Sequence, residues 1–77
     1  MMNFKITQSG LTMKCRLFQR QRYNSWVLSG TVNGEERMSC DVTATVRKYH
    51  GIRMMEELMA TASQRLRQIA ADDAIRA

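Results

Sequence analysis

The residue types that most often act as nucleophiles or general bases are scarce in this sequence. His50 is the only histidine, and the two cysteines are Cys15 and Cys40. No histidine or cysteine cluster with metal-ligand spacing is present, so a zinc site is not expected. Both cysteines fall at apolar positions of the pattern described below, which favours two buried, reduced thiols over a disulfide.

The carboxylates do not form a catalytic pair either. The acidic residues of the second half are two adjacent pairs, Glu56-Glu57 and Asp72-Asp73. Neighbouring residues of a helix do not share a face, whereas two catalytic carboxyls must flank a single bond. A glycine-rich phosphate-binding loop is also missing from the sequence. We therefore expect a non-enzymatic protein without a cofactor or a metal.

Basic side chains are the remaining candidates, as binding groups. The 77 residues include 12 Lys and Arg against 7 Asp and Glu, which gives a net charge of +5 and a pI of about 9.9. Residues 1–50 contain eight of the basic and three of the acidic residues, whereas residues 51–77 contain four of each. The excess charge in the first half predicts an anionic partner, either nucleic-acid phosphate or an acidic protein surface.

The first half of the chain must position these charges, and its pattern is that of strands. Apolar and polar residues alternate through 4–7, 11–18, 26–32 and 37–42. Ser9-Gly10 and Asn33-Gly34 are typical of hairpin turns, and 21–24 is a polar loop. The sequence predicts an antiparallel meander of four strands, in which Trp26 contributes to the core.

The register follows from placing apolar residues opposite one another on one face. The predicted pairs are Phe4 with Cys15, Ile6 with Met13, Leu17 with Leu28, and Met13 with Val32. A two-residue turn at Asn33-Gly34 would point Met38 and Cys40 away from that face. We therefore predict a β-bulge, placed at Gly34 in a three-residue turn.

The second half has the three- and four-residue spacing of a helix, from about 52 to 71. The pattern over 43–50 does not decide whether a separate short helix forms there. Such a helix would have Asp41 or Thr43 as its N-cap and Gly51 as its C-cap. The long helix should cover the apolar face of the sheet through positions 52, 55, 58/59, 62, 66 and 69. The prediction is a single α+β domain spanning 1–77, and homodimerisation through Met54 and Leu58 is also left open.

The opposite face of the sheet collects the charges. The basic residues of the second strand and Phe18 are all even-numbered, whereas the core positions of that strand are odd. The register adds Lys5 beside Lys14, and Val27 beside Phe18 as an exposed apolar patch. The predicted partner-binding residues are Lys5, Lys14, Arg16, Phe18, Arg20, Arg22, Tyr23 and Arg37. A plain solvated face is the alternative interpretation.

No apolar run approaches the ~18 residues of a membrane span, and Met1 to Ile6 are too polar for a signal peptide. The expected location is therefore the cytoplasm, and no membrane partner is expected.

In size and order of elements the chain resembles the small phage-encoded anti-CRISPR proteins that block type I surveillance complexes. The matching features are a strand that begins Met13-Lys14-Cys15-Arg16, a strand that ends Thr31-Val32-Asn33-Gly34, a final strand, and then a helix. This resemblance implies a non-enzymatic inhibitor that docks on Cas subunits in the host cytoplasm and obstructs guide RNA or target DNA. It assigns no role to any single residue.

Three hypotheses result. The first is a protein-binding inhibitor whose strongest contacts are Arg16, Phe18, Arg20 and Tyr23, because arginine and aromatic residues dominate such interfaces. The second is a nucleic-acid-binding module that places Lys14, Arg16, Arg20 and Arg22 on phosphates. The third is a small oligomer-forming structural protein.

Overall fold

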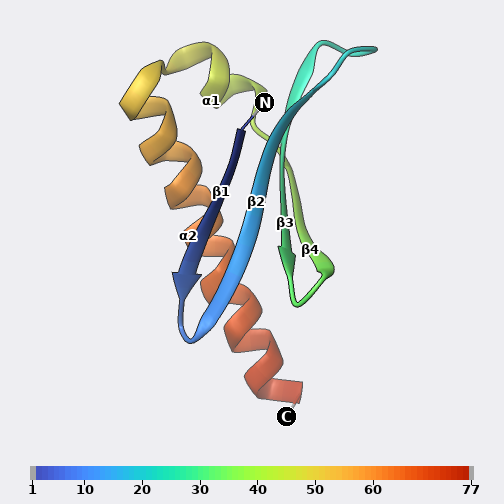
Figure 1. Ribbon diagram of the computed structural model, residues 1–77, viewed down its shortest axis with the longest axis vertical. Coiled ribbons are helices and arrows are strands. Elements are labelled where there is room, and N and C mark those ends of the chain that lie inside the picture. The colour runs from blue at the N-terminus through green and yellow to red at the C-terminus, as the bar shows by residue number, and fades with distance from the viewer. Residues whose placement is uncertain (1, 77) are drawn as a thin grey trace.

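The computed structural model describes residues 2–76, which form four strands followed by two helices. The elements are β1 (Met2–Gln8), β2 (Leu11–Arg20), β3 (Ser25–Val32), β4 (Glu35–Asp41), α1 (Thr43–Lys48) and α2 (Gly51–Arg76). The strands form one antiparallel sheet in the order β1-β2-β3-β4, and α2 runs obliquely along one side of it (Figure 1). The predicted α+β meander with a covering helix is confirmed, and the short first helix is present.

The register of the first two hairpins agrees with the prediction. Phe4 lies opposite Cys15 and Ile6 opposite Met13 across β1 and β2, while Leu17 lies opposite Leu28 across β2 and β3. Ser9 and Gly10 form the first turn with φ of 56° and 79°. Positive φ at both positions matches the turn geometry that continues the right-handed twist of the flanking strands.

The third hairpin contains the predicted bulge, but at a different residue. Asn33 and Gly34 both have positive φ, 54° and 79°, and form a plain two-residue turn, with Val32 opposite Glu35. The register shifts between Gly30 and Thr31, so that Thr31 pairs with Glu36 and Gly30 with Met38. The extra residue is therefore Arg37. The position predicted for the bulge, Gly34, was wrong because the two turn residues already satisfy the hairpin without an insertion.

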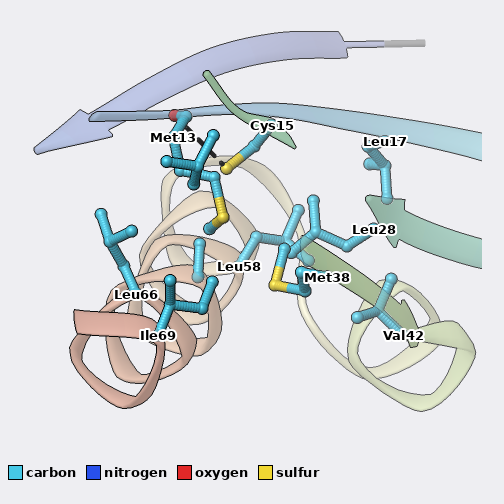
Figure 2. Close-up of a cluster of buried hydrophobic side chains, with 11 residues drawn as sticks. Met13, Cys15, Leu17, Leu28, Met38, Val42, Leu58, Leu66 and Ile69 are labelled. Carbon is cyan, nitrogen blue, oxygen red and sulfur yellow. Dashed lines mark hydrogen bonds between the residues drawn. The ribbon is translucent and has the colours of Figure 1, made fainter. Parts of the chain in front are cut away.

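One continuous core lies between the sheet and α2 (Figure 2). Met13, Leu28, Leu58 and Leu66 are its largest side chains with no exposed surface. Gly30 lies against Met13, because a Cβ at Gly30 would be only 2.5 Å from the Met13 Sδ. Burial of each such large apolar side chain contributes about 1.5–3 kcal/mol, so this layer accounts for much of the stability of a chain this short.

The buried stripe of α2 differs from the predicted one. Leu58 is fully buried in the core, which contradicts its assignment to a dimer interface, and Met54 packs partly against the same cluster. Ile52, predicted to begin the seam, is 81% exposed. The stripe advances by four residues from Met54 through Leu58, Ala62 and Leu66, and this direction is inclined to the helix axis, as expected for a helix that crosses the strands obliquely.

The chain passes from sheet to helix through a compact hydrogen-bonded corner. Val42 N–H donates to the Trp26 carbonyl (2.8 Å), and Trp26 N–H donates to Thr43 Oγ1 (2.9 Å). Thr43 N–H donates to Asp41 Oδ1 (2.9 Å), and this bond lowers the pKa of Asp41. The N-cap position of α1 is Val42, which makes no side-chain capping bond, so the predicted N-cap of Asp41 or Thr43 was wrong; Asp41, one residue earlier, accepts from the first helical N–H. Trp26 packs at the rim of the core, half-buried.

The helix ends also differ from the prediction. Gly51, with φ of 58°, begins α2, while Tyr49 occupies the C-cap position of α1. At the other end α2 continues to Arg76, five residues past the predicted end at Ala71. The bulged Arg37 reaches this last part of α2, where its Nη2 lies 3.0 Å from Asp73 Oδ1. The Arg37 guanidinium lowers the pKa of Asp73, and the carboxylate raises the pKa of Arg37.

Gly30→Ala is expected to destabilise the fold by about 1–3 kcal/mol, because the new methyl group enters space that the buried Met13 occupies. Met13→Ala removes the obstructing side chain, so the double variant should lose less stability than the sum of the two single losses. Urea unfolding of the four proteins measures this. Ser29→Ala, the neighbour on the opposite face of β3, is the control, and an unchanged Gly30→Ala protein would contradict the packing.

Asp73→Asn should make the protein less sensitive to acid. Because the folded state lowers the pKa of Asp73 below its ordinary value of 3.8, the ion pair with Arg37 stabilises the fold fully above that value. This stabilisation is lost as pH falls through the lowered pKa. The difference in melting temperature between wild type and Asp73→Asn should therefore shrink from about pH 6 to about pH 2.5. Glu56→Gln, on the exposed part of α2, is the control, and a pH-independent difference would contradict the assignment.

Candidate functional site

The exposed face of the sheet presents a row of cations from β1 and β2. Lys14, Arg16 and Arg20 occupy alternate, solvent-exposed positions of β2, with consecutive even positions ~6.6–7 Å apart. Lys5 of β1 lies directly opposite Lys14. Like charges in such a pair destabilise a sheet, so the fold retains an unfavourable arrangement here. We refer to these four residues as the basic row.

Phe18 is part of this face, but it is less accessible than predicted. It lies opposite Val27 and is half-buried, and the Arg16 Cζ atom lies 5.1 Å from the centre of its ring. Val27 is only 4% exposed. The predicted exposed Phe18–Val27 patch is therefore wrong. The two side chains lie directly across from one another on the outer face, and the guanidinium of Arg16 stacks on the aromatic ring.

The turn between β2 and β3 carries the next two predicted residues. Tyr23 is 68% exposed, and the Arg22 Cζ atom lies 5.7 Å from its ring centre. Asn24, with φ of 50°, closes the turn and accepts a hydrogen bond from Gln19 Nε2 at 2.6 Å. This bond ties the turn to β2. Arg22 and Tyr23 therefore extend the basic row beyond the end of the sheet.

The last predicted residue, Arg37, lies on the other side of the sheet. Its side chain pairs with Asp73 of α2 and is 22% exposed. Because the bulge falls at Arg37 and not at Gly34, the side chains of Glu36 and Arg37 point to the opposite faces of the sheet from those predicted. Glu36 now faces outward beside Thr31. The outer face loses a guanidinium and gains a carboxylate, and the predicted position of Arg37 on that face was wrong.

A shallow hollow of about 650 Å³ lies on this outer face. Its lining includes residues of all four strands: Asn3 and Lys5, Lys14, Arg16 and Phe18, Ser29 and Thr31, and Glu36. The sequence reasoning missed Asn3 and Glu36. Alternation with Lys5 would have identified Asn3, whereas Glu36 depends on the location of the bulge. The hollow can accept an anionic group near the lysines and a hydrogen-bonding group near the hydroxyls.

The charge on the outer face is divided between its two sides. The basic row lies on β1 and β2, whereas β4 presents Glu36 and Asp41 on this face, both exposed. The ion pairs of residues 2–76 are Arg37–Asp73 and Arg53–Glu57, so no member of the basic row takes part in one within that range. The cations of the basic row are therefore available to a partner without breaking an internal pair.

A second cationic cluster lies where α1 meets α2, and the sequence reasoning did not select it. The Lys48 Nζ and Arg53 Cζ atoms lie 5.3 Å and 5.2 Å from the ring centre of Tyr49. Arg47 Nη2 donates to the Asn24 carbonyl at 3.5 Å, which links α1 to the β2–β3 turn. A signal was present, because Lys48 is adjacent to Tyr49 and Arg53 follows it by four residues.

The cysteines are free thiols in the structure. Burial raises the pKa of Cys15 to about 11, so this residue is a thiol at neutral pH and a weak nucleophile. Cys40 is half-buried, and Arg65 Nη2 lies 3.8 Å from its Sγ. Among residues 2–76 no group of three histidine, cysteine or acidic side chains is placed to hold a metal ion.

Neither helix of the described chain is both long enough and apolar enough to cross a membrane. Comparisons with protein-family models, with curated proteins and with solved structures found no match to this chain.

Proposed function

We propose that this protein is a non-enzymatic binding protein that docks on an acidic protein surface through the outer face of its sheet. The observation that carries the proposal is the basic row, four exposed cations that take part in no ion pair within residues 2–76, three of which line a hollow. Complementary charge across an interface speeds encounter and fixes orientation. Phe18 and Tyr23 add the aromatic contacts that concentrate binding energy.

Two features of the hollow favour a protein partner over a nucleic acid. Glu36 lies in the same hollow as Lys14 and would repel a phosphate chain, whereas a protein can offer it a basic residue. Phe18 is half-buried with Arg16 against its ring, so it is a poor platform for stacking a base. The resemblance to anti-CRISPR proteins supplies the specific candidate, the Cas subunits of a type I surveillance complex in the host cytoplasm.

The second candidate is a module that binds single-stranded nucleic acid, and one observation favours it. Tyr23 is exposed beside Arg22, and Tyr49 lies between Lys48 and Arg53. Aromatic rings flanked by cations are typical of surfaces that stack bases and contact phosphates. These groups lie outside the hollow, so the two candidates share Tyr23 but differ in the hollow, which serves the first, and in the cluster at Tyr49, which serves the second.

The double variant Arg16→Glu with Arg20→Glu should weaken capture of the partner by about tenfold or more. It should leave the melting temperature nearly unchanged, because both side chains are exposed. Binding is measured by pull-down from nuclease-treated host lysate and against a purified type I surveillance complex. Arg67→Glu with Arg76→Glu on α2 makes the same change in net charge and should bind normally. Equal losses in both double variants would show that only net charge matters and would refute the proposed face.

A salt titration with single-stranded DNA and RNA separates the two candidates. If nucleic acid is the partner, the logarithm of the association constant should fall with the logarithm of salt, with a slope of about −0.7 per phosphate contact. Tyr23→Ala and Tyr49→Ala should then weaken binding. We expect no saturable binding at low salt, and a salt-dependent complex sensitive to both tyrosines would replace the protein-docking proposal with the second candidate.

A further inference from the structure

The β1 strand forms an open edge of the sheet. All seven of its residues pair with β2 in one unbroken register, from Met2 opposite Leu17 to Gln8 opposite Leu11. The two-residue turn makes Gln8 and Leu11 a hydrogen-bonded pair, and this pattern alternates along an antiparallel ladder. Phe4 and Ile6 therefore bond to β2, whereas Asn3, Lys5 and Thr7 direct their backbone N–H and C=O groups away from the sheet.

The opposite edge of the sheet does not offer the same opportunity. β4 is interrupted by the bulge at Arg37, and Asp41 at its end leads directly into the corner before α1. Bulges and acidic side chains are features that prevent further pairing at an edge. A straight, unbroken edge therefore occurs at β1, next to the basic row.

A second hollow, of about 600 Å³, runs along β1 on the side of α2. Its lining is mostly apolar or small: Ile6, Met59, Ala60 and Ser63, with Lys5, Thr7 and Glu56. Met59 is 43% exposed there. Lys5 also lines the hollow on the outer face. The open edge of β1 thus lies between an apolar hollow on one side and a basic one on the other.

An extended peptide fits both hollows at once, because successive side chains of a strand point to opposite faces. One set would cover Met59 and Ile6, and the other would lie beside Lys5 and Lys14. We propose that β1 receives an extended segment of the partner as a fifth strand, with acidic residues on the outer face alternating with apolar residues on the α2 face. Backbone hydrogen bonds to an edge and pockets for alternate side chains are a recurring mode of peptide recognition.

This inference rests on the proposed function and specifies the partner's contact segment. Charge selects that segment over a second copy of the chain. The β1 strand, Met2–Gln8, contains Lys5 and no acidic residue, so a second β1 would add positive charge to an edge that is already basic. A lysine in the middle of an edge strand disfavours pairing with most other strands. Its positive charge favours pairing with an acidic strand.

The test uses the full chain and a capped peptide of about seven residues in which glutamate and valine alternate, long enough to match β1. Amide exchange is followed residue by residue by NMR. In the free protein, the amides of Lys5 and Thr7 should exchange faster than those of Phe4 and Ile6. Saturating peptide should slow exchange at Lys5 and Thr7 by about tenfold or more. A peptide with lysine in place of glutamate should not bind.

Thr7→Pro and Thr7→Ala form the matched pair of variants. Both lose the hydrogen bond between the Thr7 and Thr12 hydroxyls, but only proline removes the outward N–H, a change that an edge strand tolerates. We expect Thr7→Pro to bind the peptide about tenfold more weakly or worse, and Thr7→Ala to bind within about twofold of wild type. If Thr7→Pro does not fold, Met59→Glu provides the same readout from the apolar hollow.

The outcomes distinguish this inference from the proposed function. Absence of peptide binding, or binding that leaves the exchange of Lys5 and Thr7 unchanged, overturns strand addition. A doubled mass in light scattering with these amides protected in the absence of peptide would assign the edge to a second copy and also overturn it. In either case, capture from lysate that depends on Arg16 and Arg20 would leave the proposed function intact.

Discussion

The sheet depends on one extra residue in β4. Side chains of a strand alternate between its two faces, and the two-residue turn at Asn33-Gly34 would by itself direct Met38 and Cys40 away from α2. The bulge at Arg37 reverses that parity and allows β4 to contribute to the core. It also decides the chemistry of both surfaces, because it sends Arg37 to Asp73 on α2 and places Glu36 in the outer hollow.

Much of the fold could be predicted because several patterns agree. Alternating strands, hairpin turns with residues that tolerate positive φ, and an apolar helix stripe all indicate the same architecture, and two hairpin registers follow from apolar pairing alone. The position of the bulge could not be predicted in this way, since an insertion at Gly34 or at Arg37 restores the same core face. The end of α2 was missed for another reason. Its last turns from Ala71 bury little surface, so apolar periodicity stops there, whereas alanine favours continuation of the helix.

The candidate site was predictable to the same extent as the register. Residues of β1 and β2 are on the face where alternation placed them, from Lys5 to Arg20. Arg37 was misplaced because its orientation depends on the bulge. The exposure of Val27 was misjudged because alternation gives the direction of a side chain but not what covers it. The cluster at Tyr49 forms only where two helices meet, and no strand pattern could indicate it.

The division of charge makes the outer face more selective than its total charge suggests. A uniformly basic face would attract any polyanion, including nucleic acid in excess. Here the cations are gathered on β1 and β2, while Glu36 and Asp41 lie on the outer face of β4. The proposed partner, with acidic residues facing β1 and β2 and basic residues facing β4, would be bound in one orientation, and the reversed orientation would be opposed by repulsion at both sides. A strand added at β1 would fix the same orientation through the backbone, so edge and face would select for the same partner geometry.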